Sequence, residues 1–327
     1  MKNFADKVID AIKEKKSYLC VGLDPQLRYF PPHILKWAAS NWKDPLQAVG
    51  EAIYEFNKII IDVTYDFAMG FKPQMAFHEK YGYHGVRAFE RTTSYIKTYG
   101  ALCIEDAKRE DGGDTAQAYA DGHLGEIDVI GEGGKLVKIP SAYNIDAITI
   151  TPWIGQPNFQ PFKKVAAARG KGIFVVDKTS FKPEAELQEI MTPEEVRAWI
   201  VLARQVRELG VDVKGRYGYS SIGVVMGATY PQDAEIMKVE IPDAIKLVPG
   251  VGAQKGSADD AVVSVNEDGF GFIANNSRAT NYAYLSKFSE EFACDPEKFQ
   301  LAASNASRQS RDALNDAVLR RIGHLPF

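Results

Sequence analysis

The sequence predicts an α/β protein built as a closed parallel (β/α)8 barrel. Short apolar runs alternate with segments of helical periodicity along the whole chain. These runs are almost continuously hydrophobic, which is typical of strands buried on both faces of a sheet. Eight of them can be recognised, and polar residues follow nearly every one. An open doubly wound sheet is the alternative arrangement of the same elements.

The elements follow one another in a regular order. Strands are predicted over residues 18–23, 67–71, 101–105, 147–151, 172–176, 222–226, 244–248 and 270–274. Helices are predicted over 4–15, 45–65, 84–99, 115–122, 159–169, 193–209, 231–239 and 257–264, and two more over 282–292 and 296–319. Asp44 and Pro45 have the residue types expected at the start of the second helix. Thr192 and Glu195 predict a capping box for the helix over 193–209, with Gly210 as its C-cap.

One segment interrupts this alternation. Two β-like runs flank residues 131–134, within the stretch 125–140. Strand-like runs separated by a glycine-rich turn predict a β-hairpin inserted into the repeating pattern. No linker or internal repeat divides the chain, so residues 1–327 are expected to form one catalytic domain with helical extensions at both ends.

Composition narrows the class of protein. The chain has 327 residues, of which 45% are hydrophobic and 25% charged, an ordinary globular composition. The net charge of −4 argues against a nucleic-acid partner, which favours a basic surface. Three cysteines form a sparse, odd set that fits a reducing compartment. No apolar run approaches the roughly 20 residues that cross a bilayer. A cytoplasmic protein with no membrane partner is therefore expected.

The most informative stretch is DAKREDGGDT, residues 106–115, which directly follows the third strand. Asp106 and Lys108 are two positions apart, so in a strand they point to the same face. Asp111 lies further on, in the predicted loop. Charges directly after a buried strand favour a preorganised electrostatic site. The alternative interpretation is a solvated run of surface charges.

Other polar residues stand at the ends of other predicted strands. Asp24 follows the first strand, Lys72 the second, and Thr179 and Ser180 follow the fifth. In a barrel these ends share one mouth, which is where such enzymes place their active sites. The mouth is therefore the candidate site.

A phosphate site is predicted after the last two strands. PGVGAQKG, residues 249–256, supplies glycines whose backbone N–H groups can approach an anion. Gln254 can both donate and accept, and Arg278, after the eighth strand, can bind phosphate with two hydrogen bonds. The alternative is a tight turn beside a surface arginine. The glycine spacing does not match a dinucleotide-binding fingerprint.

A metal site is not favoured. Asp106, Asp111 and Asp114 have oxygen ligands that suit Mg²⁺, but the nearby lysines would compete for the same carboxylates. The five histidines form no metal-binding pair in the sequence. His78, six positions after Lys72, is the one most worth locating.

With these residues in place, the chain resembles the orotidine 5'-phosphate decarboxylases. The likeness rests on Asp106, Lys108, Asp111 and Thr115, spaced as D-x-K-x-x-D with a threonine four further on. Five other segments carry it: CVGLDP (20–25), FKPQMAFHEKYG (71–82), DAITITPWIG (146–155), VDKTS (176–180), and VPGVGAQKG with NNSR. They occur in order across 19–279 and resemble the longer bacterial (type 2) subgroup.

The resemblance implies decarboxylation of orotidine 5'-phosphate to UMP in pyrimidine biosynthesis, without metal or organic cofactor. It implies a charge network of Lys72, Asp106, Lys108 and Asp111, in which Lys108 stabilises and protonates a carbanion at C6. It also implies a homodimer, in which Asp111 and Thr115 reach the partner's site.

The resemblance also implies which residues bind the ribose, the pyrimidine and the phosphate of the substrate. Asp24 and Lys72 would hold the ribose, Ser180 the pyrimidine, and Gln254 with Arg278 the 5'-phosphate. Gly112 departs from the family pattern, which has an apolar residue there. Two other functions remain open: a catalytically silent nucleotide-binding barrel, and a Mg²⁺-dependent sugar-phosphate decarboxylase.

Overall fold

A closed parallel barrel forms the body of the molecule. The computed structural model describes residues 1–181, 186–250 and 256–327. The barrel strands neighbour one another in the order β1-β10-β9-β8-β7-β6-β3-β2, and the last closes on the first. They are β1 (Leu19–Leu23), β2 (Gly70–Pro73), β3 (Leu102–Arg109), β6 (Ala147–Ile150), β7 (Gly172–Lys178), β8 (Ser220–Met226), β9 (Ala244–Pro249) and β10 (Phe272–Asn276). The predicted barrel is confirmed, and the open sheet is wrong.

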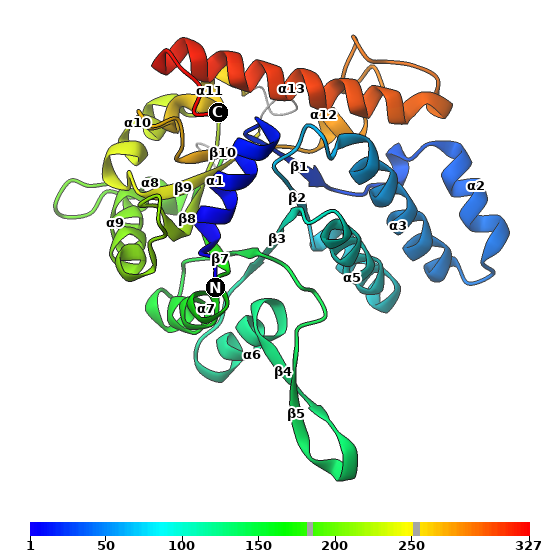
Figure 1. Ribbon diagram of the computed structural model, residues 1–327, viewed down its shortest axis with the longest axis horizontal. Coiled ribbons are helices and arrows are strands. Elements are labelled where there is room, and N and C mark those ends of the chain that lie inside the picture. Colours follow the sequence, from blue (N-terminus) through cyan, green and yellow to red (C-terminus); the bar gives the residue numbers. More distant parts are fainter. Residues whose placement is uncertain (182–185, 251–255) are drawn as a thin grey trace.

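Helices surround the barrel (Figure 1). They are α1 (Phe4–Lys15), α2 (Pro32–Asn41), α3 (Pro45–Thr64), α4 (Ala76–Glu79), α5 (Gly82–Thr98), α6 (Gly113–Leu124), α7 (Gln156–Arg169), α8 (Glu186–Glu189), α9 (Ala198–Gly210), α10 (Pro231–Glu240), α11 (Ala258–Ala261), α12 (Arg278–Asn281) and α13 (Phe299–Ile322). Short 3-10 turns occur at Leu27–Tyr29, Glu132–Gly134, Val211–Val213, Val262–Ser264 and Pro296–Lys298. No helix in the described ranges has the length and apolar character needed to span a membrane.

Helix α1 packs at the amino-terminal end of β7. The rings of Phe4 and Phe174 meet edge to face, with centroids 5.8 Å apart. A Cβ atom on Gly172, the first residue of β7, would lie 2.1 Å from the Phe4 ring, so glycine is needed for this close approach. Lys7 Nζ donates to the Gly170 carbonyl at 2.8 Å. Because α1 covers this end, the opposite, carboxyl-terminal end is left as the open mouth.

Three strands run further toward the mouth than their apolar runs predict. β2 includes Lys72 and Pro73, β3 continues to Arg109, and β7 continues to Lys178. Lys72 is in register with Gly22 of β1, so parallel pairing extends β2 past its apolar segment. Lys72, Asp106 and Lys108 therefore lie on strands rather than in loops, and their positions are set by the barrel itself.

The predicted helix over 193–209 begins later than expected, at Ala198. Thr192 and Glu195 form a turn instead of a capping box, and Glu195 has a positive φ of 58°. An antiparallel bridge between Met191 and Arg197 holds this turn. A local capping signal is thus overridden by backbone pairing across the turn, and Gly210 is the last helical residue rather than the cap.

The predicted helix over 282–292 is also wrong, because these residues form successive turns. Tyr282 and Tyr284 are buried, and their hydroxyls donate to the carbonyls of Asp24 and Tyr29 at 2.8 and 2.9 Å. These tertiary contacts fold the segment back onto the loop after β1.

The inserted hairpin is confirmed as β4 (Glu126–Ile130) paired antiparallel with β5 (Leu136–Pro140). It projects from the end of α6, away from the barrel (Figure 1). Cross-strand pairs Ile127–Ile139 and Val129–Val137 share one face, which is therefore aliphatic.

Candidate active site

A cavity of about 480 Å³ opens at the carboxyl-terminal end of the barrel. Among the residues that the structure describes, its charged lining residues are Lys72, Lys108, Arg278, Asp24 and Asp106. These described residues place three cations against two carboxylates, a surplus of positive charge. The cavity is thus suited to an anionic ligand of nucleotide size.

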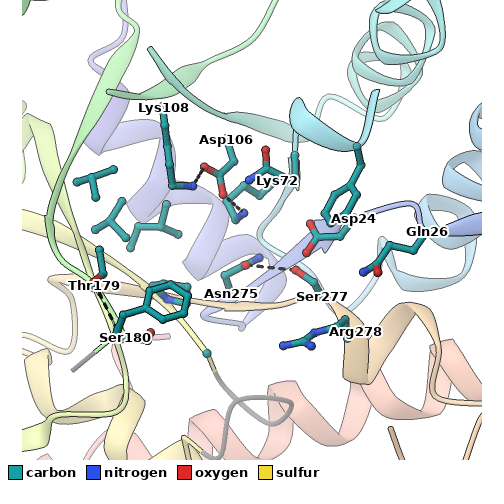
Figure 2. Close-up of a pocket in the computed structure, with 18 residues that line it drawn as sticks. Asp24, Gln26, Lys72, Asp106, Lys108, Thr179, Ser180, Asn275, Ser277 and Arg278 are labelled. Carbon is teal, nitrogen blue, oxygen red and sulfur yellow. Dashed lines mark hydrogen bonds and ion pairs between the residues drawn. The ribbon is translucent and has the colours of Figure 1, made fainter. Parts of the chain in front are cut away.

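Asp106 lies between two lysine ammonium groups (Figure 2). Lys72 Nζ is 2.6 Å from Asp106 Oδ2, and Lys108 Nζ is 2.5 Å from Oδ1. Lys72 comes from β2 and the other two residues from β3, which are neighbouring strands. The i and i+2 positions of Asp106 and Lys108 do point the same way, as predicted. The charges alternate in space as well as in sequence.

Burial and charge act in opposite directions on this trio. Desolvation raises the pKa of Asp106, but Lys72 and Lys108 outweigh it and hold that pKa well below its ordinary value. For Lys72, burial lowers the pKa, but the carboxylates of Asp106 and Asp24 outweigh it and raise the pKa overall. Both groups therefore stay ionised although Lys72 is only 4% exposed. Lys108 is more open, with 45% of its side chain exposed to the cavity mouth.

The backbone under Lys108 is irregular. Glu105 pairs with Ile148 of β6 and Arg109 with Ile150, so β3 advances four residues while β6 advances two. Lys108 has a φ of 49°, the left-handed region that non-glycine residues seldom adopt. Thr149, opposite this bulge, bonds both Asp106 and the Lys108 amide. Sequence reasoning missed Thr149, whose only signal is a hydroxyl within an apolar strand.

Asp24 also lines the cavity, directly after the last residue of β1. Its Oδ1 atom is buried and has no hydrogen-bond partner among the described residues. Burial raises the pKa of Asp24, and the nearby Lys72 reduces that rise. A buried carboxylate oxygen without a donor suits a ligand hydroxyl.

The loop after β7 brings Thr179 and Ser180 to the cavity. Thr179 N–H donates to Gln188 Oε1 at 3.0 Å, which ties the loop to α8. A Cβ atom on Gly227 would lie 2.7 Å from both the backbone nitrogen and the hydroxyl of Ser180. Glycine at the end of β8 therefore allows Ser180 to sit over the cavity.

Arg278 begins α12 on the other side of the cavity from Lys108 (Figure 2). Its guanidinium forms no ion pair with any described residue, so it is available to a ligand anion. Ser277 lies next to it, and a Cβ on Gly22 would come 1.9 Å from the Ser277 hydroxyl. Gln254, the other predicted phosphate ligand, is outside the described residues.

Asp111 and Thr115 do not line the cavity of their own chain. Asp111 N–H donates to Asn158 Oδ1 at 3.3 Å, and Asp111 Oδ1 accepts from the Gly112 amide at 2.7 Å. Thr115 is exposed on α6. The structure therefore brings together Asp24, Lys72, Asp106, Lys108, Ser180 and Arg278, but leaves Asp111 and Thr115 outside this group.

No three His, Cys, Asp or Glu side chains converge as a metal centre anywhere in the described ranges. His78 is fully buried, and burial lowers its pKa to about 4. Its Nδ1 lies 3.0 Å from the Gln74 carbonyl, and its Nε2 lies 3.3 Å from Asn57 Nδ2. A neutral ring that donates from Nδ1 and accepts at Nε2 fits both contacts. His78 thus holds the turn after β2 rather than facing the cavity.

Sequence comparison places this chain beside known enzymes. The model of the orotidine 5'-phosphate decarboxylase / HUMPS family matches residues 17–271. The orotidine 5'-phosphate decarboxylase of Caldicellulosiruptor saccharolyticus is 34% identical over 313 residues, covering 96% of this chain and 99% of that protein. A Clostridium perfringens protein of the same name is 33% identical, covering 97% of this chain and 99% of the relative.

Solved structures agree in fold. The Leishmania donovani OMP decarboxylase superposes with a TM-score of 0.71 at 25% identity, covering 97% of this chain and 99% of that one. The Plasmodium berghei orotidine 5'-monophosphate decarboxylase has a TM-score of 0.74, covering 98% and 100%. Its 18% identity supports the shared fold alone.

Proposed function

We propose a residue-level mechanism for this chain, which belongs to the orotidine 5'-phosphate decarboxylase / HUMPS family. It is an enzyme that decarboxylates orotidine 5'-phosphate to UMP and CO₂ in pyrimidine biosynthesis. One observation carries the residue assignments: Asp106 is held between two lysine ammonium groups at one side of a cavity that has Arg278 at the other.

Lys108 is the proposed proton donor. When the bond between C6 and the carboxylate breaks, CO₂ leaves and the electron pair stays on C6. The Lys108 ammonium stabilises that negative charge and then transfers a proton to C6, giving UMP and a neutral amine that solvent reprotonates. A unit charge pair about 4 Å apart is worth roughly 4 kcal/mol at an effective dielectric of about 20. Lys108 is the more exposed of the two lysines and reaches the cavity mouth, as this role requires.

Asp106 and Lys72 keep that ammonium in place. Asp106 stays ionised, so it attracts the Lys108 ammonium and keeps it directed into the site. A substrate carboxylate bound beside Asp106 is repelled by the negative charge of that residue. The repulsion ends when neutral CO₂ departs. Lys72 contacts the other oxygen of Asp106 and offsets its negative charge. It remains charged because the carboxylates of Asp106 and Asp24 raise its pKa.

The remaining lining residues bind the parts of the substrate that do not react. Asp24, whose Oδ1 lacks a donor, accepts from ribose hydroxyls together with Lys72. Ser180 contacts the pyrimidine. Arg278 and Gln254 bind the 5'-phosphate, and binding energy from that distant group helps organise the reacting end.

A homodimer in the cytoplasm is the proposed working form, with Asp111 and Thr115 completing the partner's site. Two observations support the interface. Asp111 and Thr115 stand outside their own cavity, and an apolar surface lies close by. Trp153 and Ile154 are 77% and 43% exposed, and the Ile154 amide donates to Glu110 next to Asp111. Exposed apolar groups of this kind mark contact surfaces.

The activity is tested by following the ultraviolet absorbance of orotidine 5'-phosphate with EDTA present. The expected result is substrate loss that EDTA leaves unchanged, with UMP as product. Loss of all turnover on chelation would favour the Mg²⁺-dependent sugar-phosphate branch instead, and UMP binding without any turnover would favour a silent nucleotide-binding barrel.

The shared site is tested by mixing two inactive variants, Lys108→Ala and Asp111→Ala. A heterodimer of the two contains one site with both native residues, so mixing should restore part of the activity. Subunit exchange is followed with differently tagged protomers. If exchange is complete and no activity returns, Asp111 does not act across a dimer.

A further inference from the structure

A register irregularity in the barrel includes the proposed proton donor, Lys108. Between Glu105 and Arg109, β3 carries two more residues than the facing part of β6, and Thr149 is the β6 residue opposite this bulge. A bulge of this kind interrupts the ladder and leaves backbone groups without strand partners. Lys108 within it has a φ of 49°. Something outside the ladder must therefore hold the Lys108 backbone.

The Thr149 hydroxyl makes that contact and one more. The Lys108 amide donates to Thr149 Oγ1 at 3.0 Å. The same oxygen lies 3.0 Å from Asp106 Oδ1. An amide can only donate and an ionised carboxylate can only accept, so the single hydroxyl proton must point to Asp106. Both contacts thus have a fixed direction.

These contacts close a ring around the reactive group. The Thr149 hydroxyl is hydrogen-bonded to the Lys108 amide and to Asp106 Oδ1. Lys108 Nζ donates to the same Oδ1 atom at 2.5 Å. Thr149 is 1% exposed and sits on a barrel strand, so its own position is rigid. It does not line the cavity and does not touch the space a substrate would fill.

We infer that Thr149 is a positioning residue for decarboxylation, fixing the left-handed backbone of Lys108 and the Asp106 carboxylate so that the ammonium is aimed at C6. This inference rests on the proposed function of Lys108. Left-handed backbone at a non-glycine residue persists only where its surroundings enforce it, and the Thr149 hydroxyl is the group that enforces it here.

The test replaces Thr149 with valine, which keeps the shape but has no hydroxyl, and with serine, which keeps the hydroxyl. Wild-type turnover of orotidine 5'-phosphate is measured first, so failure of the proposed function itself is seen separately. For Thr149→Val we expect kcat per UMP-binding site to fall about 10–100-fold. KM and UMP affinity should change less than about threefold, because Asp24, Ser180 and Arg278 are untouched. Thr149→Ser should recover most of the lost kcat.

A matched control is Thr64→Val. Thr64 is also fully buried, and its hydroxyl donates to the Ile60 carbonyl at 2.7 Å within α3, away from the cavity. It should change melting temperature slightly and leave kcat alone. If Thr149→Val does not fold, Thr149→Ala serves in its place, because alanine is smaller and also has no group that can donate or accept a hydrogen bond.

Two results would overturn the inference. One is a Thr149→Val or Thr149→Ala enzyme whose kcat per UMP-binding site stays within twofold of wild type. The other is a folded Thr149→Ser enzyme as slow as the valine variant, which would show that the methyl packing matters and the hydroxyl does not.

Discussion

Asp106 and Asp177 are both buried aspartates near the carboxyl ends of barrel strands, and a lysine follows each closely in the sequence, but their surroundings are opposite. Both oxygens of Asp106 are bonded, to two ammonium groups and a hydroxyl. Neither oxygen of Asp177 has a hydrogen-bond partner within the described part of the chain. Charge holds the pKa of Asp106 down, whereas burial raises the pKa of Asp177 well above its ordinary value.

The difference lies in which lysines each carboxylate contacts. Lys72 and Lys108 both bond Asp106, whereas Lys178, although adjacent to Asp177 in the sequence, bonds other carboxylates. Lys178 is fully buried and pairs with Glu189 of α8, and its Nζ is 3.7 Å from Asp233 of α10. Buried lysines beside carboxylates therefore occur both at the cavity and in the group around Lys178. The trio of Lys72, Asp106 and Lys108 opens into the cavity, and the group around Lys178 does not.

The largest expected effect is a loss of activity when the lysine at the cavity, Lys108, is replaced. Lys108→Ala removes the proposed proton donor, so kcat should fall by on the order of 10²–10⁴-fold or more. UMP should still bind, because the phosphate and ribose contacts remain. Steady-state kinetics and UMP titration check this, and near-normal turnover would show that the donor has been misplaced.

The next effect concerns stability. Lys178→Met removes a buried cation from beside Glu189 and Asp233, and breaking a buried pair in this way costs about 3–5 kcal/mol. Urea unfolding should show that loss. Because the loop carrying Thr179 is tied to α8, KM for orotidine 5'-phosphate should also rise more than kcat falls. A stable variant with a lowered kcat and normal KM would place Lys178 in the chemistry instead.

The smallest effect is a change in pH dependence. Asp177 has a raised pKa when folded, so between its ordinary value near 4 and that raised value the folded state binds more protons than the unfolded state. Wild-type stability should therefore fall with rising pH in that window, by at most about 1.4 kcal/mol per pH unit from this group. Asp177→Asn should remove that slope, as measured by urea unfolding at pH 5 and pH 8. An unchanged slope would mean that Asp177 is not protonated.

The same residues show what could be predicted from the sequence. The shared face of Asp106 and Lys108 followed from their spacing and from the apolar strand before them. The barrel and its mouth followed from eight apolar runs with polar ends. These predictions succeed because the apolar periodicity of a strand, and the alternation of strands and helices along the chain, can be recognised from neighbouring residues.

The parts that could not be predicted depend on contacts between distant segments. In the sequence, Thr149 is one polar residue in an apolar strand. Its proposed role depends on the two-residue bulge in β3, which only the structure shows. Thr192 and Glu195 carried a sound local capping signal that a backbone bridge overrode. The roles of Asp111, Thr115 and Gln254 stay predictions, the first two because they concern a second chain.

Activity measured for Asp106→Asn beside Asp177→Asn tests the central claim most directly. Both changes replace a buried aspartate on a barrel strand with the amide of the same shape. Only Asp106→Asn also removes a negative charge, because burial raises the pKa of Asp177 well above its ordinary value. If the bonded trio at the mouth performs decarboxylation, Asp106→Asn should lower kcat by about 10²–10³-fold or more. Asp177→Asn should leave kcat within about threefold of wild type. Equal losses in both variants, or a near-normal Asp106→Asn enzyme, would contradict the assignment of the chemistry to Lys72, Asp106 and Lys108.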